Sequence, residues 1–191
     1  MESNLEKLAR EWLGNEPEKA QVKSEFYCET RDVFQARLDK MLREFLRSEG
    51  NDETNVYLAS AITGEIGNNS FDHNLGSWPD VPGIFFGYQC GNGKIEIILA
   101  DRGQGVFKTL KKVKPEIVND QDALKTAFTE RISGRAPEKR GNGLKFVKEN
   151  VEDRKMHLSF FSGQAQIEIN AEMKIGQADN EIRGCLAILN L

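Results

Sequence analysis

Apolar residues recur at helical spacing through the first 50 residues of the chain. Those of the first run share one helical face: Leu5, Leu8, Trp12 and Leu13. A polar stretch at 15–18 ends this run, and a second apolar stripe, spaced three and four apart, extends over 34–46. We therefore expect residues 1–50 to form an N-terminal helical extension to a domain over 51–191. The second stripe predicts either a helix that covers the rest of the fold or the seam of a homodimer.

A third helical pattern follows over 55–74, after which the period changes. Segments 84–90 and 94–100 are rich in β-branched and aromatic residues and flank a glycine-containing turn, which is typical of a β-hairpin. Further helices are expected over 106–113, 120–132 and 143–154, and strands over 157–162, 164–173 and 181–191. This order predicts an α/β (α+β) fold, a two-layer sandwich whose mixed, mostly antiparallel sheet is covered on one face by helices.

Composition argues against several classes of protein. The formal net charge of −4 argues against nucleic acid as the main ligand. No apolar run approaches the roughly 18 residues of a membrane span, and the charged, amphipathic N-terminus is unlike a signal peptide. The three cysteines lie far apart without a C-x-x-C motif, which is typical of free thiols in a reducing compartment. We therefore expect a cytoplasmic protein with no membrane partner.

The first candidate site lies on the third expected helix. Glu65, Asn69 and His73 are four residues apart and Asp72 is three past Asn69, so that all four share one face. Such a face is typical of a solvated helix, but it also suits a cleft that binds a charged ligand. Asn69 is a candidate Mg²⁺ ligand because its amide offers a hard oxygen. Glu65 is a candidate general base for a water that attacks a phosphate.

The second candidate site follows the second strand of the expected hairpin. Asp101, Gly103 and Gly105 form a D-x-G-x-G pattern there, which on its own is also typical of a plain turn. The two glycines let a ligand approach the backbone closely. Asp101 is a candidate acceptor for the amino group of adenine.

The third candidate site opens the last expected helix and comprises Arg140, Gly141, Asn142, Gly143 and Leu144. Glycines before a helix N-terminus expose amide N–H groups to phosphate, and the helix dipole favours the anion. The pattern lacks G-x-x-x-x-G-K-[ST], so it is not a P-loop. On its own it is also typical of a surface loop.

Together, the order and spacing of the three motifs resemble the N-box and the two glycine boxes of the GHKL ATPases. This superfamily comprises the ATPase domains of gyrase, heat-shock chaperones, histidine kinases and mismatch-repair proteins, which share the Bergerat fold. The resemblance covers the chain from about residue 50 to its end. It implies that ATP and Mg²⁺ bind between the helices and the sheet, against the residues of all three motifs and beneath a mobile lid over 133–143.

The motifs are similar to more than one branch of that superfamily. Glu65 and Asp72 are similar to the gyrase and mismatch-repair ATPases, whereas 141–148 resembles the second glycine box of histidine kinases. Neither His73 nor His157 lies on an N-terminal helix, where a phosphoacceptor would be expected, so a self-contained histidine autokinase is not favoured. The leading interpretation is an ATPase or ATP-driven conformational switch with a protein partner. The alternatives are a serine or histidine kinase that acts on a separate partner and a non-catalytic nucleotide-sensing module.

Overall fold

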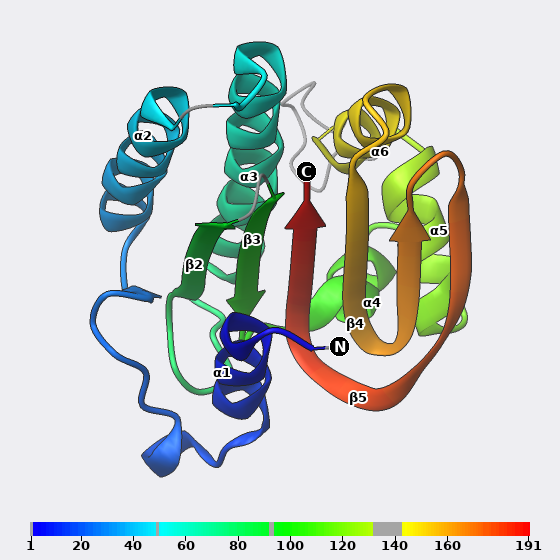
Figure 1. Cartoon of the computed structure of the whole chain (residues 1–191). Coiled ribbons are helices and arrows are strands. Elements are labelled where there is room, and N and C mark those ends of the chain that lie inside the picture. Colours follow the sequence, from blue (N-terminus) through cyan, green and yellow to red (C-terminus); the bar gives the residue numbers. More distant parts are fainter. Residues whose placement is uncertain (1, 49, 92–93, 132–142) are drawn as a thin grey trace.

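The computed structural model describes residues 2–48, 50–91, 94–131 and 143–191, which form one sheet and six α-helices (Figure 1). The sheet has the order β1-β2-β3-β5-β4 and every pairing is antiparallel: β1 (Tyr27–Cys28), β2 (Ile84–Gly91), β3 (Lys94–Asp101), β4 (His157–Ile169) and β5 (Met173–Asn190). The helices are α1 (Asn4–Gly14), α2 (Arg31–Arg47), α3 (Glu53–Asn74), α4 (Gly105–Lys111), α5 (Asp120–Thr129) and α6 (Gly143–Asp153), and a 3₁₀ turn spans Pro17–Lys19. The predicted two-layer α/β sandwich is confirmed.

Side chains alternate across the sheet and contribute to two separate cores. On one face, Ile97 and Leu99 of β3 belong to the larger core, which is completed by buried side chains of α2, α3, α5 and α6. On the other face, Ile98 of β3 packs in a second core with Leu5 and Trp12 of α1. Helix α1 therefore lies on the face opposite α3 (Figure 1).

The apolar stripe of α2 is buried inside the chain. Its side chains lie in the larger core: Phe34, Leu38, Met41 and Phe45. Helices α2 and α3 approach closely because α3 has a glycine where they meet, and a Cβ at Gly67 would overlap the ring of Phe34. The stripe thus covers the fold, as one of the two interpretations predicted; a homodimer stays a prediction. In the described ranges, no helix is long and apolar enough to span a bilayer.

Local signals place the helix ends. Asp52 caps α3 by accepting a hydrogen bond from the backbone N–H of Asn55 at 2.8 Å, so that the helix begins two residues before the predicted start. Asn119 caps α5 in the same way, through the N–H of Asp122 at 2.8 Å. These caps fix the ends of two helices that border the cavity described below.

The buried side chain of Arg102, which follows β3, forms an ion pair with Asp80 and also binds the end of α1. Nη2 of the fully buried Arg102 donates to Oδ2 of Asp80 at 2.7 Å, and its Nε donates to Oδ1 at 3.2 Å. Nη1 of the same guanidinium donates to the backbone carbonyls of Trp12 and Leu13. Those carbonyls belong to the last turn of α1, where a helix leaves its acceptors without internal partners. Arg183 also donates to Asp80, at 2.7 Å.

The C-terminal strands are longer than predicted. The strands expected over 157–162 and 164–173 are one strand, β4, which has a register shift at Gly163 and ends at Ile169, short of the predicted end. The strand expected over 181–191 begins earlier than predicted, at Met173. Gly184 bends β5 with φ +70, and a Cβ there would overlap the carbonyl oxygen of Asp101. This close contact brings β5 against the motif that follows β3.

Candidate functional site

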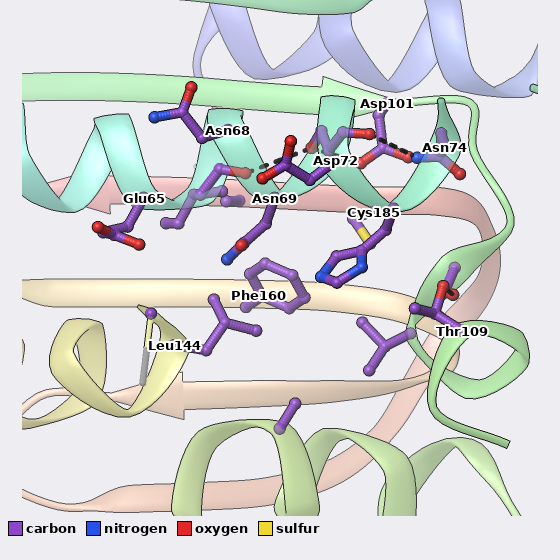
Figure 2. A pocket seen from close by; sticks show the side chains of 18 of the residues that line it. Glu65, Asn68, Asn69, Asp72, Asn74, Asp101, Thr109, Leu144, Phe160 and Cys185 are labelled. Carbon is purple, nitrogen blue, oxygen red and sulfur yellow. Dashed lines mark hydrogen bonds between the residues drawn. The ribbon is translucent and has the colours of Figure 1, made fainter. Parts of the chain in front are cut away.

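A cavity of about 300 Å³ lies between α3, strands β3, β4 and β5, and helices α4, α5 and α6. This volume is at the lower end of the range for small-molecule sites. Figure 2 shows Glu65 towards one end of the cavity and Asp101 towards the other, with Asn69 pointing into the space between them. Phe160 of β4 and Leu144 of α6 lie on the opposite wall.

The cavity brings together most of the residues that the sequence singled out. It is lined by residues from all three motifs: Glu65, Asn69, Asp72, His73, Asp101, Gly105, Gly143 and Leu144. Gly103 is buried beside the lining. A Cβ at this position would overlap the amide of Asn74. The predicted site residues Arg140, Gly141 and Asn142, and with them nearly all of the predicted lid over 133–143, lie outside the described residues.

Asp101 is held rigidly at the base of the cavity. Its side chain is 2% exposed, the Ser70 hydroxyl donates to Oδ2 at 2.7 Å, and the N–H of Gly103 donates to Oδ1 at 2.8 Å. Burial raises the pKa of Asp101 to about 6, against the opposing effect of the hydrogen bonds from Ser70 and Gly103. Cys185 also donates to this carboxylate, from its thiol and from its backbone N–H. A thiol is a weak donor, so a stronger donor on a ligand could take its place. The fold therefore places a largely ionised, fixed acceptor in an apolar setting at neutral pH.

The C-terminal turn of α3 is tied to the turn that follows Asp101. Asn74 donates from Nδ2 to the carbonyl of Ser70 at 2.8 Å and accepts at Oδ1 from the N–H of Gln104 at 2.8 Å. Gln104 in turn donates from Nε2 to the carbonyl of His73 at 3.0 Å. The first two motifs are thus one hydrogen-bonded unit, which sets the position of Asp101 relative to Asn69.

Cys185 of β5 lies next to Asp101 in the cavity wall (Figure 2). Burial, and then the negative charge of Asp101, raise the pKa of this thiol well above its usual value. The thiol is therefore protonated and serves as a weak donor and a small apolar surface. Its Sγ lies 3.7 Å from Oγ of Ser162, which donates to the carbonyl of Gly184 at 2.9 Å.

At the other end of the cavity, the start of α6 meets the polar face of α3. Glu65 is exposed and Asn69 is half-buried. A Cβ built on Gly143 would lie 2.7 Å from Oε2 of Glu65 and 3.3 Å from Nδ2 of Asn69, so only glycine leaves these polar atoms undisturbed. The positive end of the α6 dipole therefore points at the space beside Glu65 and Asn69, where an anion would be favoured.

The donors present suit a magnesium ion that is shared with a ligand. Among the residues that the structure describes, no group of three or more histidine, cysteine, aspartate or glutamate side chains is arranged to hold a metal ion. Mg²⁺ is commonly held by one or two protein oxygens, with phosphates and water completing its shell. Oδ1 of Asn69, which lines the cavity beside the start of α6, fits that requirement.

Sequence reasoning missed several residues of the site. Ser70 and Asn74 lie on the same helix as the first motif, one turn apart, and each could have been found from that spacing. Cys185 and Arg31 gave no such signal, because they reach the cavity from β5 and from the first residue of α2. Arg31 forms an ion pair with Asp72 at the cavity wall.

Comparison with family models gave no match over any part of the chain, and no curated protein matches its sequence. The case for a function therefore depends on the site.

Proposed function

We propose that the chain binds Mg²⁺·ATP and acts as a GHKL-type ATPase or ATP-driven conformational switch. One observation carries this proposal: a single cavity has a buried, fixed carboxylate at one end and an exposed glutamate, an asparagine and a helix N-terminus at the other. A ligand that matches both ends has a hydrogen-bond donor on a flat apolar body and an anionic tail. Adenine nucleotides have that chemistry.

At the buried end, the amino group of adenine donates to Asp101. Apolar side chains from four elements surround the space for the ring: Ile66, Leu110, Phe160 and Ala187. Guanine has a carbonyl where adenine has its amino group, so it would set an acceptor against the carboxylate. Unpaired buried polar groups discriminate strongly between related ligands, which favours ATP over GTP.

At the exposed end, Glu65 serves as the general base. It accepts a proton from a water whose oxygen attacks the γ-phosphorus, while the bond between that phosphorus and the β–γ bridging oxygen breaks. Asn69 would hold Mg²⁺, which when bound neutralises negative charge on the phosphate oxygens. The N-terminus of α6 adds its positive potential at the same place.

The exposure of Glu65 favours a protein kinase as the second candidate function. A groove lined by Leu38, Tyr57, Gly64 and Phe146 adjoins the cavity at Glu65, and a hydroxyl of a protein partner could approach along it in place of water. Transfer of the γ-phosphoryl group to a purified partner, without release of free phosphate, would select this alternative.

Calorimetric titration tests the proposed function. We expect ATP and ADP to bind with Mg²⁺ present, GTP to bind at least tenfold more weakly, and ATP to release phosphate slowly. Failure of the protein to bind any adenine nucleotide would refute the proposal. Tight binding without turnover, with or without partners, would leave a nucleotide-sensing module.

Adenosine affinity is expected to fall in mild acid. The pKa of Asp101 is about 6 without ligand, and only the ionised form is the acceptor proposed for the amino group. At pH 5 about one molecule in ten is ionised, so the apparent Kd for adenosine should rise about tenfold relative to neutral pH. Adenosine is the right probe because it has no phosphate to titrate. A flat profile between pH 5 and 7 would contradict the assignment.

The Asp101→Asn variant is expected to bind adenine nucleotides at least tenfold more weakly, a loss of about 1.4 kcal/mol or more. The amide retains one acceptor, which the N–H of Gly103 already uses. The variant should also lose the pH dependence of adenosine binding. Equilibrium titration of ATP and adenosine at several pH values checks both outcomes.

The stability of that variant supplies the control. The folded-state pKa of Asp101 is raised, so its protonated form stabilises the fold below pH 3.8, and this contribution is lost as the pH rises to about 6. The non-titrating amide avoids that loss. Ligand-free Asp101→Asn should therefore melt at the same temperature as the parent or higher at pH 7.5, which separates weak binding from misfolding.

A further inference from the structure

The described part of the cavity wall has more acidic than basic side chains. Four carboxylates line it: Glu65, Asp72, Asp101 and Glu130. Lys114 neutralises Glu130 from outside the lining, at 2.5 Å. Within the described lining, Arg31 is the one lysine or arginine. A triphosphate placed there would meet net negative charge unless a cation of the protein turned towards it.

The backbone of Arg31 is held in place by α2, whereas its guanidinium group is exposed to solvent. It is the first residue of α2, and the side chain of Thr30 caps that helix through the N–H of Val33 at 3.3 Å. The close packing of Phe34 on Gly67 holds this end of α2 against α3. The guanidinium forms an ion pair with Asp72 and remains 45% exposed, so it can rotate without disturbing the core.

We propose that Arg31 is a phosphate-binding residue that the N-terminal extension contributes to the nucleotide site, an inference that rests on the proposed function. A guanidinium has five N–H donors, and the pair with Asp72 uses only part of them. The remaining donors match phosphate oxygens in geometry and charge. Asp72 orients the guanidinium at the cavity wall. A phosphate of the ligand then binds the guanidinium either together with Asp72 or in its place.

This assignment makes α2 part of the site and predicts which ligands gain from it. Affinity should increase from adenosine to the di- and triphosphates, and this gain should depend on Arg31. A residue that only pinned α2 to α3 would affect all adenine ligands alike. The comparison of phosphorylated with unphosphorylated ligands therefore separates the two roles.

The test measures Kd by calorimetry for Mg²⁺·ATP, Mg²⁺·ADP and adenosine with the full chain. Arg31→Ala is expected to weaken Mg²⁺·ATP binding about tenfold and to change adenosine binding less than twofold. Arg31→Lys should recover part of the loss. Asp72→Asn should strengthen Mg²⁺·ATP binding, since it removes a negative charge and releases the guanidinium. Lys40→Ala, on the same helix but outside the cavity lining, controls for the loss of a distant positive charge.

The outcomes separate this proposal from the one on which it rests. Equal losses for adenosine and ATP in Arg31→Ala, or no loss for ATP, would overturn the role of Arg31 and leave the proposed function intact. A parent protein that binds neither ligand would remove both. If Arg31→Ala does not fold, Arg31→Gln takes its place, since it keeps a polar side chain without a charge, and the same selective loss for ATP is required.

Discussion

Replacement of Asp80 by alanine is expected to lower the free energy of unfolding by about 3–5 kcal/mol, the usual effect of leaving a buried charge without its partner. The Arg102 guanidinium is fully buried, and both oxygens of Asp80 accept its hydrogen bonds. Its other hydrogen bonds go to the carbonyls of Trp12 and Leu13, which cannot neutralise it. Urea unfolding followed by circular dichroism measures the change, and α1 should lose protection from hydrogen exchange first.

Arg183→Ala is the matched control for this prediction. Arg183 donates to the same carboxylate, but its side chain is 43% exposed, and solvated ion pairs contribute no more than about 1 kcal/mol. If Asp80→Ala destabilised the protein no more than Arg183→Ala does, the attachment of α1 through Arg102 would not depend on the buried ion pair.

Acid should weaken the ion pair between Asp80 and Arg102. Burial alone would raise the pKa of Asp80, but the hydrogen bonds from Arg102 and Val81 outweigh burial and hold the pKa below its ordinary value of 3.8. A carboxyl group with a lowered folded-state pKa stabilises the fold above pH 3.8, and that contribution is lost as the pH falls through the folded-state value. As the pH falls into strong acid, the free energy of unfolding should therefore decrease more in the parent than in the Asp80→Ala variant.

Arg102 also illustrates what the sequence could not predict. In the D-x-G-x-G pattern from Asp101 to Gly105 it occupies an unspecified position, between residues that are proposed to lie near a nucleotide. An arginine in a turn is expected at the surface. Its burial arises because position 102 faces α1, and its partners lie 22 and about 90 residues away in the chain. Such a contact depends on tertiary structure alone.

The accuracy of the predicted elements follows the strength of their local pattern. Helix α3 and the hairpin of β2 and β3 have clear periodicity and match prediction to within two residues. Strand β1 is two residues long and exists only because Tyr27 and Cys28 pair with β2. The first half of β5 is polar and includes Gly176, and it forms a strand because Ile175 pairs with Ile167 of β4. Its stabilising contacts come from the neighbouring strand, so the local sequence carries little signal.

The candidate site divides in the same way. Motif residues on α3 and at the end of β3 could be predicted, because helical spacing and strand ends place them independently of the rest of the fold. Gly103 was expected to give room to a nucleotide, whereas in the structure it gives room to Asn74. Arg31 could not be assigned to the site from sequence, since only the packing of α2 on α3 brings it to Asp72.

Glu65→Gln is expected to lower phosphate release by about 10²–10⁴-fold, the usual contribution of a general base, while the Kd for Mg²⁺·ATP stays within a few-fold of the parent. The amide fills the same space beside Gly143, so the start of α6 should not move. It cannot accept the proton of the attacking water. Because that proton moves only in the transition state, the loss should appear in turnover and not in binding.

Asn69→Ala, one helical turn away on the same face, should lose binding as well as turnover. In the proposed cycle its amide oxygen would hold Mg²⁺ in every state, so the Mg²⁺-dependent part of ATP binding should disappear together with turnover. Adenosine should bind to both variants as it does to the parent, because the Asp101 end is unchanged. Single-turnover phosphate release and titration with and without Mg²⁺ distinguish the two patterns, and melting curves must match the parent. Full turnover in Glu65→Gln would remove Glu65 as the base and favour another proton acceptor at the exposed end of the cavity.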